Sequence, residues 1–207
     1  MNESLLSNST TDNSTISKES EINSSYESQT SVNADLTDKI IDSISLSLNE
    51  IIKDNKARGK SPKQDIFYLG FIPPISIKEY IKNLMKYSNM DISSLITSII
   101  YIDRFCDKNN YNLTKNNIFR ILLTACLLSI KFNEDINIIT KYYAEVVGIP
   151  VLDLNNLEFY LCVKLKFSLF VDYDIYQKYF EFFCKYNYSE NKETENINNN
   201  KKKCNNK

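Results

Sequence analysis

Apolar residues recur three or four positions apart throughout residues 35–188, which is the spacing of helices. The first stripe lies between residues 40 and 52, with Asp, Glu and Lys opposite, and predicts an amphipathic helix that needs a surface to lie on. Strict alternation of apolar and polar positions, the pattern of a half-buried strand, occurs only in the short 167–171 segment. The predicted fold class is therefore all-α. Further helices are predicted over about 77–86, 92–107, 115–131 and 140–147, from Asp153 onward, and after the 167–171 segment.

Residues that favour helix ends support these positions. Ser76 and Glu79 have the spacing of a capping box at the start of one helix. Thr114 can cap the helix that follows it, and Gly148, with Pro150 beyond it, stops another.

The helix predicted over 115–131 is apolar nearly all the way round. A helix without a polar face has to be enclosed by other helices. We therefore expect one buried helix inside a shell of about five. Its apolar residues are Ile118, Phe119, Ile121, Leu122, Leu123, Ala125, Cys126, Leu127, Leu128 and Ile130.

Polar composition separates the two ends of the chain from this helical block. Of the first 34 residues, 19 are Ser, Thr or Asn, and residues 189–207 are mostly Asn, Lys and Glu. Such segments bury too little apolar surface to offset the entropy of ordering. The expected organisation is a disordered tail over 1–34, a folded block over 35–188 and a second disordered tail over 189–207.

Charge and composition exclude several kinds of function. The formal net charge is -1, and we interpret the one basic run, Lys201–Lys203, as a solvated chain end, so no nucleic-acid partner is expected. The chain has no histidine and only 3 glycines, which removes the usual general base and any phosphate-binding glycine loop. We predict no catalytic residue, no cofactor, no metal site and no small-molecule substrate.

The cysteines and the hydropathy bear on location. The 5 cysteines are an odd number without metal-ligand spacing, and Cys126 and Cys162 fall in apolar helical runs, as buried reduced thiols do. The N-terminus lacks the basic and apolar regions of a secretory signal, and no apolar run approaches the ~20 residues of a membrane helix. We expect an intracellular protein, in the cytoplasm or the nucleus, without a membrane partner.

Five motifs, in order and at matching spacing, resemble those of P/U-type cyclins, the group typified by the fungal phosphate-response cyclin. The resemblance covers residues 71–169 and implies a single cyclin box of five helices around a buried third helix. The stripe at 40–52 is then an extra N-terminal helix, and a sixth helix follows the box. The motifs are PPISIKEYI at 73–81, YIDRF at 101–105, LLTACLLSIKF at 122–132 followed by Glu134 and Asp135, KYYAEVVGIP at 141–150, and LNNLE at 154–158.

The resemblance implies a regulatory subunit that binds and activates a cyclin-dependent protein kinase. In the family, a Lys at the end of the third helix and a Glu in the fifth form the polar centre of the kinase contact, and these match Lys131 and Glu158. From the residues alone, the favoured interpretation is that the two are solvated charges at the rim. The resemblance also implies apolar kinase contacts at Leu128, Phe132, Phe167 and Leu169.

Several positions depart from the pattern of cell-cycle cyclins. The counterpart of Asp103 pairs there with an Arg on the first box helix, which here offers only lysines, so its partner is unknown. Arg120 stands where those cyclins have Leu, and their Met-Arg-Ala-Ile-Leu docking motif is missing, so their mode of substrate docking is not expected. Ser61 and Pro62 form a minimal site for a proline-directed kinase.

Two other classes of function compete with the activating cyclin. A cyclin-like helical scaffold that binds another protein without activating a kinase comes second. A small helical enzyme comes third, because histidine and any convergent polar cluster are missing. The sequence names neither the kinase nor its substrates.

Overall fold

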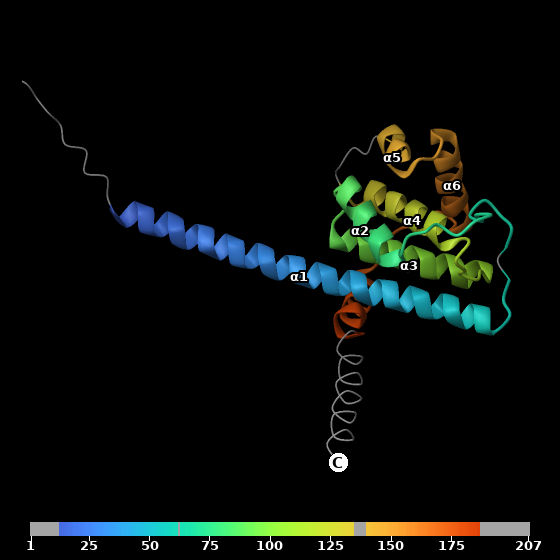
Figure 1. Ribbon diagram of the computed structural model, residues 1–207, viewed down its shortest axis with the longest axis horizontal. Coiled ribbons are helices and arrows are strands. Elements are labelled where there is room, and N and C mark those ends of the chain that lie inside the picture. The colour runs from blue at the N-terminus through green and yellow to red at the C-terminus, as the bar shows by residue number, and fades with distance from the viewer. Residues whose placement is uncertain (1–12, 62, 135–139, 187–207) are drawn as a thin grey trace, which may run out of the picture. The chain divides into compact units, whose positions relative to one another are not determined.

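The structure, a computed structural model, describes residues 13–61, 63–134 and 140–186, with side chains from residue 34 onward. Within these ranges every regular element is a helix, which confirms the predicted all-α class (Figure 1). A further helix over residues 173–186 is called the C-terminal helix below. The other helices are α1 (Asn13–Ala57), α2 (Ile77–Ser88), α3 (Ile92–Asn109), α4 (Ile118–Asn133), α5 (Thr140–Val147) and α6 (Val151–Lys164).

Helix α1 begins at Asn13, although the composition predicted a disordered tail up to residue 34. Ser, Thr and Asn have low intrinsic helix propensity, so local sequence does not indicate a helix there. Backbone contacts divide the chain after Asp38 into two compact units. The expected boundaries at 34 and 188 stay predictions, and the tail over 189–207, with its basic run, lies outside the described residues, as does Pro62.

In the larger unit, the part of α1 from Lys39 onward buries the predicted stripe against the core. Ile51, predicted to be part of that stripe, is instead 46% exposed because it faces a cavity described below. Burying several large aliphatic side chains at ~1.5–3 kcal/mol each is what holds this helix in place. The buried residues of the stripe are Ile40, Ile41, Ile44, Leu48 and Ile52.

Helix α4 is the centre of the fold, as its sequence predicted. Every residue from Ile118 to Ile130 except Arg120 is buried. Helices α2, α3 and α6 pack against it, and α5 packs against α2 and α6 (Figure 1). The packing of these neighbours therefore fixes where the C-terminal end of α4 lies relative to α6.

Helices α2, α3 and α5 begin where the sequence predicted, whereas α4 and α6 do not. Ser76 Oγ accepts a hydrogen bond from the Glu79 N–H at 3.1 Å, and the Glu79 carboxylate accepts one from the Ser76 N–H, so the predicted capping box exists. Thr114 does not cap α4, because residues 115–117 form a turn and the helix begins only at Ile118. Helix α6 begins at Val151, two residues before the expected start at Asp153.

Among the described helices, none is by itself both long and apolar enough to cross a membrane. Helices α5 and α6 reach that length and apolarity only together, and they are bent by 106° where they meet.

Candidate partner-binding site

The C-terminal end of α4 and the middle of α6 are joined by an ion pair. Lys131 Nζ donates to both carboxylate oxygens of Glu158, at 2.9 and 2.7 Å. The side chain of Lys131 is 29% exposed and that of Glu158 is 18% exposed, so the pair is partly buried yet reachable from outside. A cation in the last turn of α4 also interacts favourably with the free carbonyl groups there.

The sequence folds this way locally because α6 has two apolar faces. Its inner face, at the period of a helix, buries Leu154, Leu157 and Leu161 against α4 and the core. Glu158 lies at the edge of that inner face, which brings its carboxylate to the end of α4.

The opposite face of α6 carries large apolar side chains that remain in solvent. Leu152 and Phe159 are 69% and 67% exposed, and Val163, one turn beyond Phe159, is 44% exposed. Exposed apolar side chains gathered on one face are typical of a protein-binding surface. The sequence motifs did not indicate this face, although the spacing of its three residues at i, i+7 and i+11 is that of one side of a helix.

The segment after α6, residues 165–170, displays two more aromatic rings. Phe167 is 64% exposed and Phe170 is 69% exposed. The backbone of Lys166 and Phe167 lies in the left-handed region, with φ of 57° and 55°. L-residues avoid this region at a cost of roughly 1–2 kcal/mol each, so the rest of the structure must hold the segment.

The structure places the six expected site residues differently from one another. Lys131 and Glu158 meet, and Phe132, which follows Lys131 directly, is 49% exposed. Leu169 is half-buried against the core. Leu128 is 4% exposed, so it packs inside the core and has little surface to offer a partner.

The partner of Asp103, unknown from the sequence, is a tyrosine of the C-terminal helix. The Tyr179 hydroxyl donates a hydrogen bond to Asp103 Oδ2. The two residues are 76 positions apart, and the C-terminal helix lies outside the residues that the resemblance covers. No local feature of the sequence therefore indicates this hydrogen bond. Asp103 therefore joins the C-terminal helix to α3.

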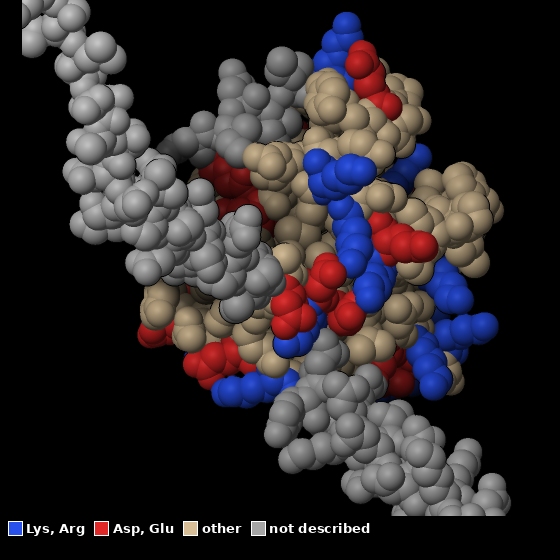
Figure 2. Space-filling model, turned by 60° about the vertical axis from the view of Figure 1, so that its left-hand side comes forward, with Lys and Arg blue, Asp and Glu red and all other residues tan. Residues whose placement is uncertain are grey.

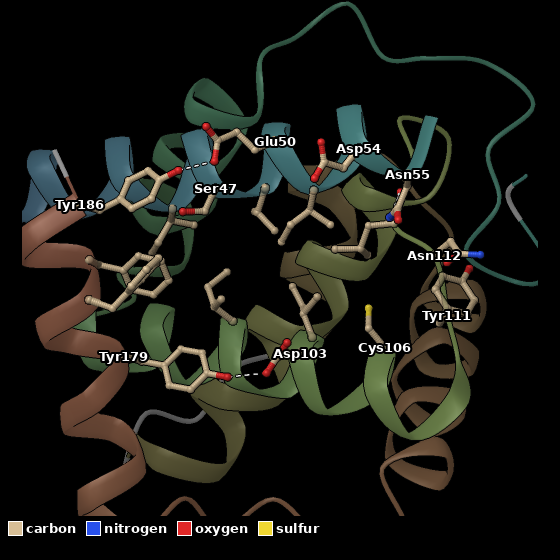
Figure 3. Close-up of a pocket in the computed structure, with 18 of the residues that line it drawn as sticks. Ser47, Glu50, Asp54, Asn55, Asp103, Cys106, Tyr111, Asn112, Tyr179 and Tyr186 are labelled. Carbon is tan, nitrogen blue, oxygen red and sulfur yellow. Dashed lines mark hydrogen bonds between the residues drawn. The ribbon is translucent and has the colours of Figure 1, made fainter. Parts of the chain in front are cut away.

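A cavity of about 740 Å³ lies between α1, α3 and the C-terminal helix (Figure 3). Figure 3 shows Tyr179 and Tyr186 donating hydrogen bonds to Asp103 and Glu50 across it. Its lining holds three carboxylates and two lysines, so the cavity discriminates little between ligands of opposite charge. None of the six expected site residues lines it. It is therefore separate from the surface around Lys131 and Glu158.

The thiols and the acidic side chains of the described residues bear on reactivity and on metal binding. Burial raises the pKa of the Cys106 and Cys126 thiols to about 12, so both stay protonated and are poor nucleophiles near neutral pH. Among the described side chains, no three Cys, Asp or Glu lie close enough to hold a metal ion. On the face in Figure 2, basic and acidic side chains are interleaved, without a concentrated basic patch.

These observations define the class of the protein: an all-helical box, built round α4, with an apolar outer surface beside a partly buried ion pair. The sequence model of the cyclin family matches residues 2–169. The chain therefore belongs to the cyclin family, whose members are regulatory subunits.

Curated relatives support the subgroup that the motifs indicated. The chain is 31% identical to cyclin-U2-1 of Arabidopsis thaliana over 135 residues, 65% of this chain and 60% of the relative. It is 30% identical to cyclin-P3-1 of Oryza sativa subsp. japonica over 130 residues, 63% of this chain and 54% of the relative. It is 36% identical to cyclin-U3-1 of Arabidopsis thaliana over 120 residues, 58% of this chain and 54% of the relative. The chain is thus a P/U-type cyclin, and it spans little more than half the length of these relatives.

Proposed function

We propose that this cyclin binds a cyclin-dependent protein kinase and activates it through the surface formed by Lys131, Glu158, Phe132, Phe167 and the outer face of α6. The observation that carries the proposal is the Lys131–Glu158 pair at the end of the central helix. It stands at the positions where the family pattern has the polar centre of the kinase contact.

The chemistry of the pair suits a contact with another protein. An ammonium group has three donors, and two of those of Lys131 point at Glu158, so one remains for a partner. A carboxylate accepts about four hydrogen bonds, so Glu158 also has unused acceptors. Phe132 directly follows Lys131 and Phe159 directly follows Glu158, and they are 49% and 67% exposed. A partner that covers these rings would exclude water from the pair, which strengthens interface charges.

Activation would follow from pressure on the kinase's regulatory helix. Protein kinases are active only when a glutamate of that helix pairs with the lysine that binds ATP. A rigid box that packs against the helix favours this arrangement. The cyclin then contributes position and surface, and the kinase contributes the chemistry.

The proposal is tested with the purified chain and a panel of purified cyclin-dependent kinases. Binding is measured by calorimetry, and activity by phosphorylation of a Ser-Pro peptide with and without the cyclin. We expect at least one kinase to bind and to gain activity. Binding without activation would favour the scaffold alternative, and absence of binding across the panel would overturn the proposal.

An intracellular location is part of the same proposal, because the kinase would be met there. The four described cysteines, Cys106, Cys126, Cys162 and Cys184, are free thiols. Free thiols are the usual state in reducing compartments, which supports this location.

A further inference from the structure

Two side chains of α3 hold three successive carbonyl groups of the segment that follows α6. The Tyr101 hydroxyl donates to the Leu169 carbonyl at 2.8 Å. Arg104 Nη1 donates to the Ser168 carbonyl at 3.2 Å and to the Phe170 carbonyl at 2.9 Å. Tyr101 and Arg104 lie three positions apart, on one side of α3, so a single helix face binds the whole segment.

The segment needs such support. Its left-handed residues Lys166 and Phe167 are each disfavoured roughly tenfold against right-handed backbone, so the segment would not keep this path unaided. Backbone hydrogen bonds hold the N–H groups of residues 166–169, among them Lys166 to Val163 and Phe167 to Cys162, both at 2.9 Å, but their acceptors all lie within residues 162–167 of the same stretch. Beyond Phe167, the two α3 side chains are what tie the carbonyls of 168–170 to the box.

The position of Arg104 shows that its role is not filling the core. Tyr101 is fully buried, whereas Arg104 is half-buried at the edge of α3. Burial raises the pKa of the Tyr101 hydroxyl to about 12, so the hydroxyl keeps the proton that it donates. Removing the guanidinium would leave little cavity, but it would free two carbonyl groups of the segment.

The consequence of this support is the display of two rings. Phe167 directly precedes the supported carbonyls and Phe170 carries the last of them, and both side chains are more than 60% exposed. Side chains held in place before binding lose little conformational freedom on binding, which strengthens association. Phe170 was not among the residues that the sequence motifs indicated.

We propose that Tyr101 and Arg104 are positioning residues that pre-organise the 165–170 segment for kinase docking, and that Phe170 is a contact residue beside Phe167. The proposal rests on the proposed function, since the docking partner is the kinase. It adds to that function a role for α3, which raises the affinity for the kinase by holding the 165–170 segment in place without forming part of the contact surface.

The experiment uses the full chain with Arg104→Met, Tyr101→Phe and Phe170→Ala. Lys108→Met, which removes an exposed charge from the same helix, is the matched control. Backbone amide hydrogen exchange of the free chain reports the segment directly, because the N–H groups of residues 166–169 all donate to carbonyls of the chain. Affinity for the kinase found in the panel, and thermal melting, complete the measurements.

We expect Arg104→Met to speed exchange over 166–169 by roughly tenfold and to weaken kinase binding by a similar factor, with exchange elsewhere unchanged. Tyr101→Phe should act in the same direction with a smaller factor, and Arg104→Lys, which keeps one donor group, should recover part of both effects. Phe170→Ala should weaken binding about tenfold while leaving exchange over 166–169 unchanged.

Unchanged exchange in both Arg104→Met and Tyr101→Phe would overturn the positioning role. Faster exchange with unchanged kinase affinity, while Lys131→Glu does weaken binding, would show that the segment is held but not used for docking, which also overturns the proposal. Unchanged binding by Phe170→Ala would remove that residue from the contact. Failure of the proposed function itself is recognised separately, because the unaltered chain would then bind no kinase whatever the exchange rates are.

Discussion

Reversing the charges of Lys131 and Glu158, singly and together, separates a stabilising role from a binding role. Lys131→Glu or Glu158→Lys alone places two like charges where oppositely charged atoms now lie 2.7–2.9 Å apart. The double variant exchanges the charges and can form the pair again in the free chain. If the pair only stabilises the box, the double variant regains the behaviour of the unaltered chain.

The expected magnitudes for stability and binding differ widely. With side chains 29% and 18% exposed, the pair is partly screened by solvent, so each single reversal should cost about 1 kcal/mol of stability. In a chain of this size that lowers Tm by about 2–4 °C. Loss of one partner of a desolvated interface charge pair costs ~2–5 kcal/mol, which is ~30- to several-thousand-fold in kinase affinity.

The assay pairs calorimetric affinity for the kinase with thermal melting followed by circular dichroism. Lys115→Glu is the matched control, because Lys115 is exposed and precedes the opposite end of α4. We expect both single reversals to lose binding with small changes in Tm. The double variant should regain the Tm of the unaltered chain and still fail to bind the kinase, because each charge then meets the wrong group on the kinase.

Two results would refute this reasoning. Full binding by the double variant would show that the pair acts only within the cyclin. A fall of more than about 10 °C in Tm for either single reversal would show that the pair belongs to the buried core, since a partly exposed pair cannot contribute that much.

The remaining predictions concern the fold. Deleting residues 1–33 should leave Tm and kinase affinity unchanged, whereas deleting residues 1–52 removes the buried stripe of α1 and should lower both; equal Tm values would contradict the packing of α1. Ser76→Ala should cost about 1 kcal/mol, seen as a Tm lower by about 2–4 °C, because it removes the capping hydroxyl; an unchanged Tm would mean that the cap contributes nothing. Stability in urea should fall as pH rises above about 9, because burial raises the pKa of Cys106 and Cys126 from 9.0 to about 12 and the unfolded chain loses these protons first. Because the chain has no histidine, its stability should change little between about pH 6 and 8. A clear stability maximum in that range would contradict this expectation.

The helices of the box could be predicted because their signals are local. The range expected for α5, 140–147, is the range observed, and the all-round apolar sequence of α4 identified it as the central helix. The capping box at Ser76 was predicted because it needs only two side chains within one turn. Thr114 failed as a cap because a turn of three residues separates it from α4, and the propensities that favour a cap do not specify that turn.

The candidate site could be predicted only in part. The motifs indicated Lys131 and Glu158, and the structure brings them together. They also indicated Leu128, which packs in the core. A motif gives the position of a residue along the helix but does not show which face the neighbouring helices cover. The outer face of α6 and the exposed ring of Phe170 were not predicted, since exposure of an apolar side chain depends on what the rest of the chain leaves uncovered.

Most helices of the box and the family could be predicted along the chain, because the period of apolar residues, the capping residues and the order of motifs are local features. Which distant polar groups meet depends instead on how the helices pack. Tyr179 reaches Asp103 across 76 residues, and Arg104 reaches the carbonyls of Ser168 and Phe170 across 64 and 66. A hydrogen bond requires donor and acceptor within about 3 Å and nearly in line, and that placement exists only once α3, α6 and the C-terminal helix have packed.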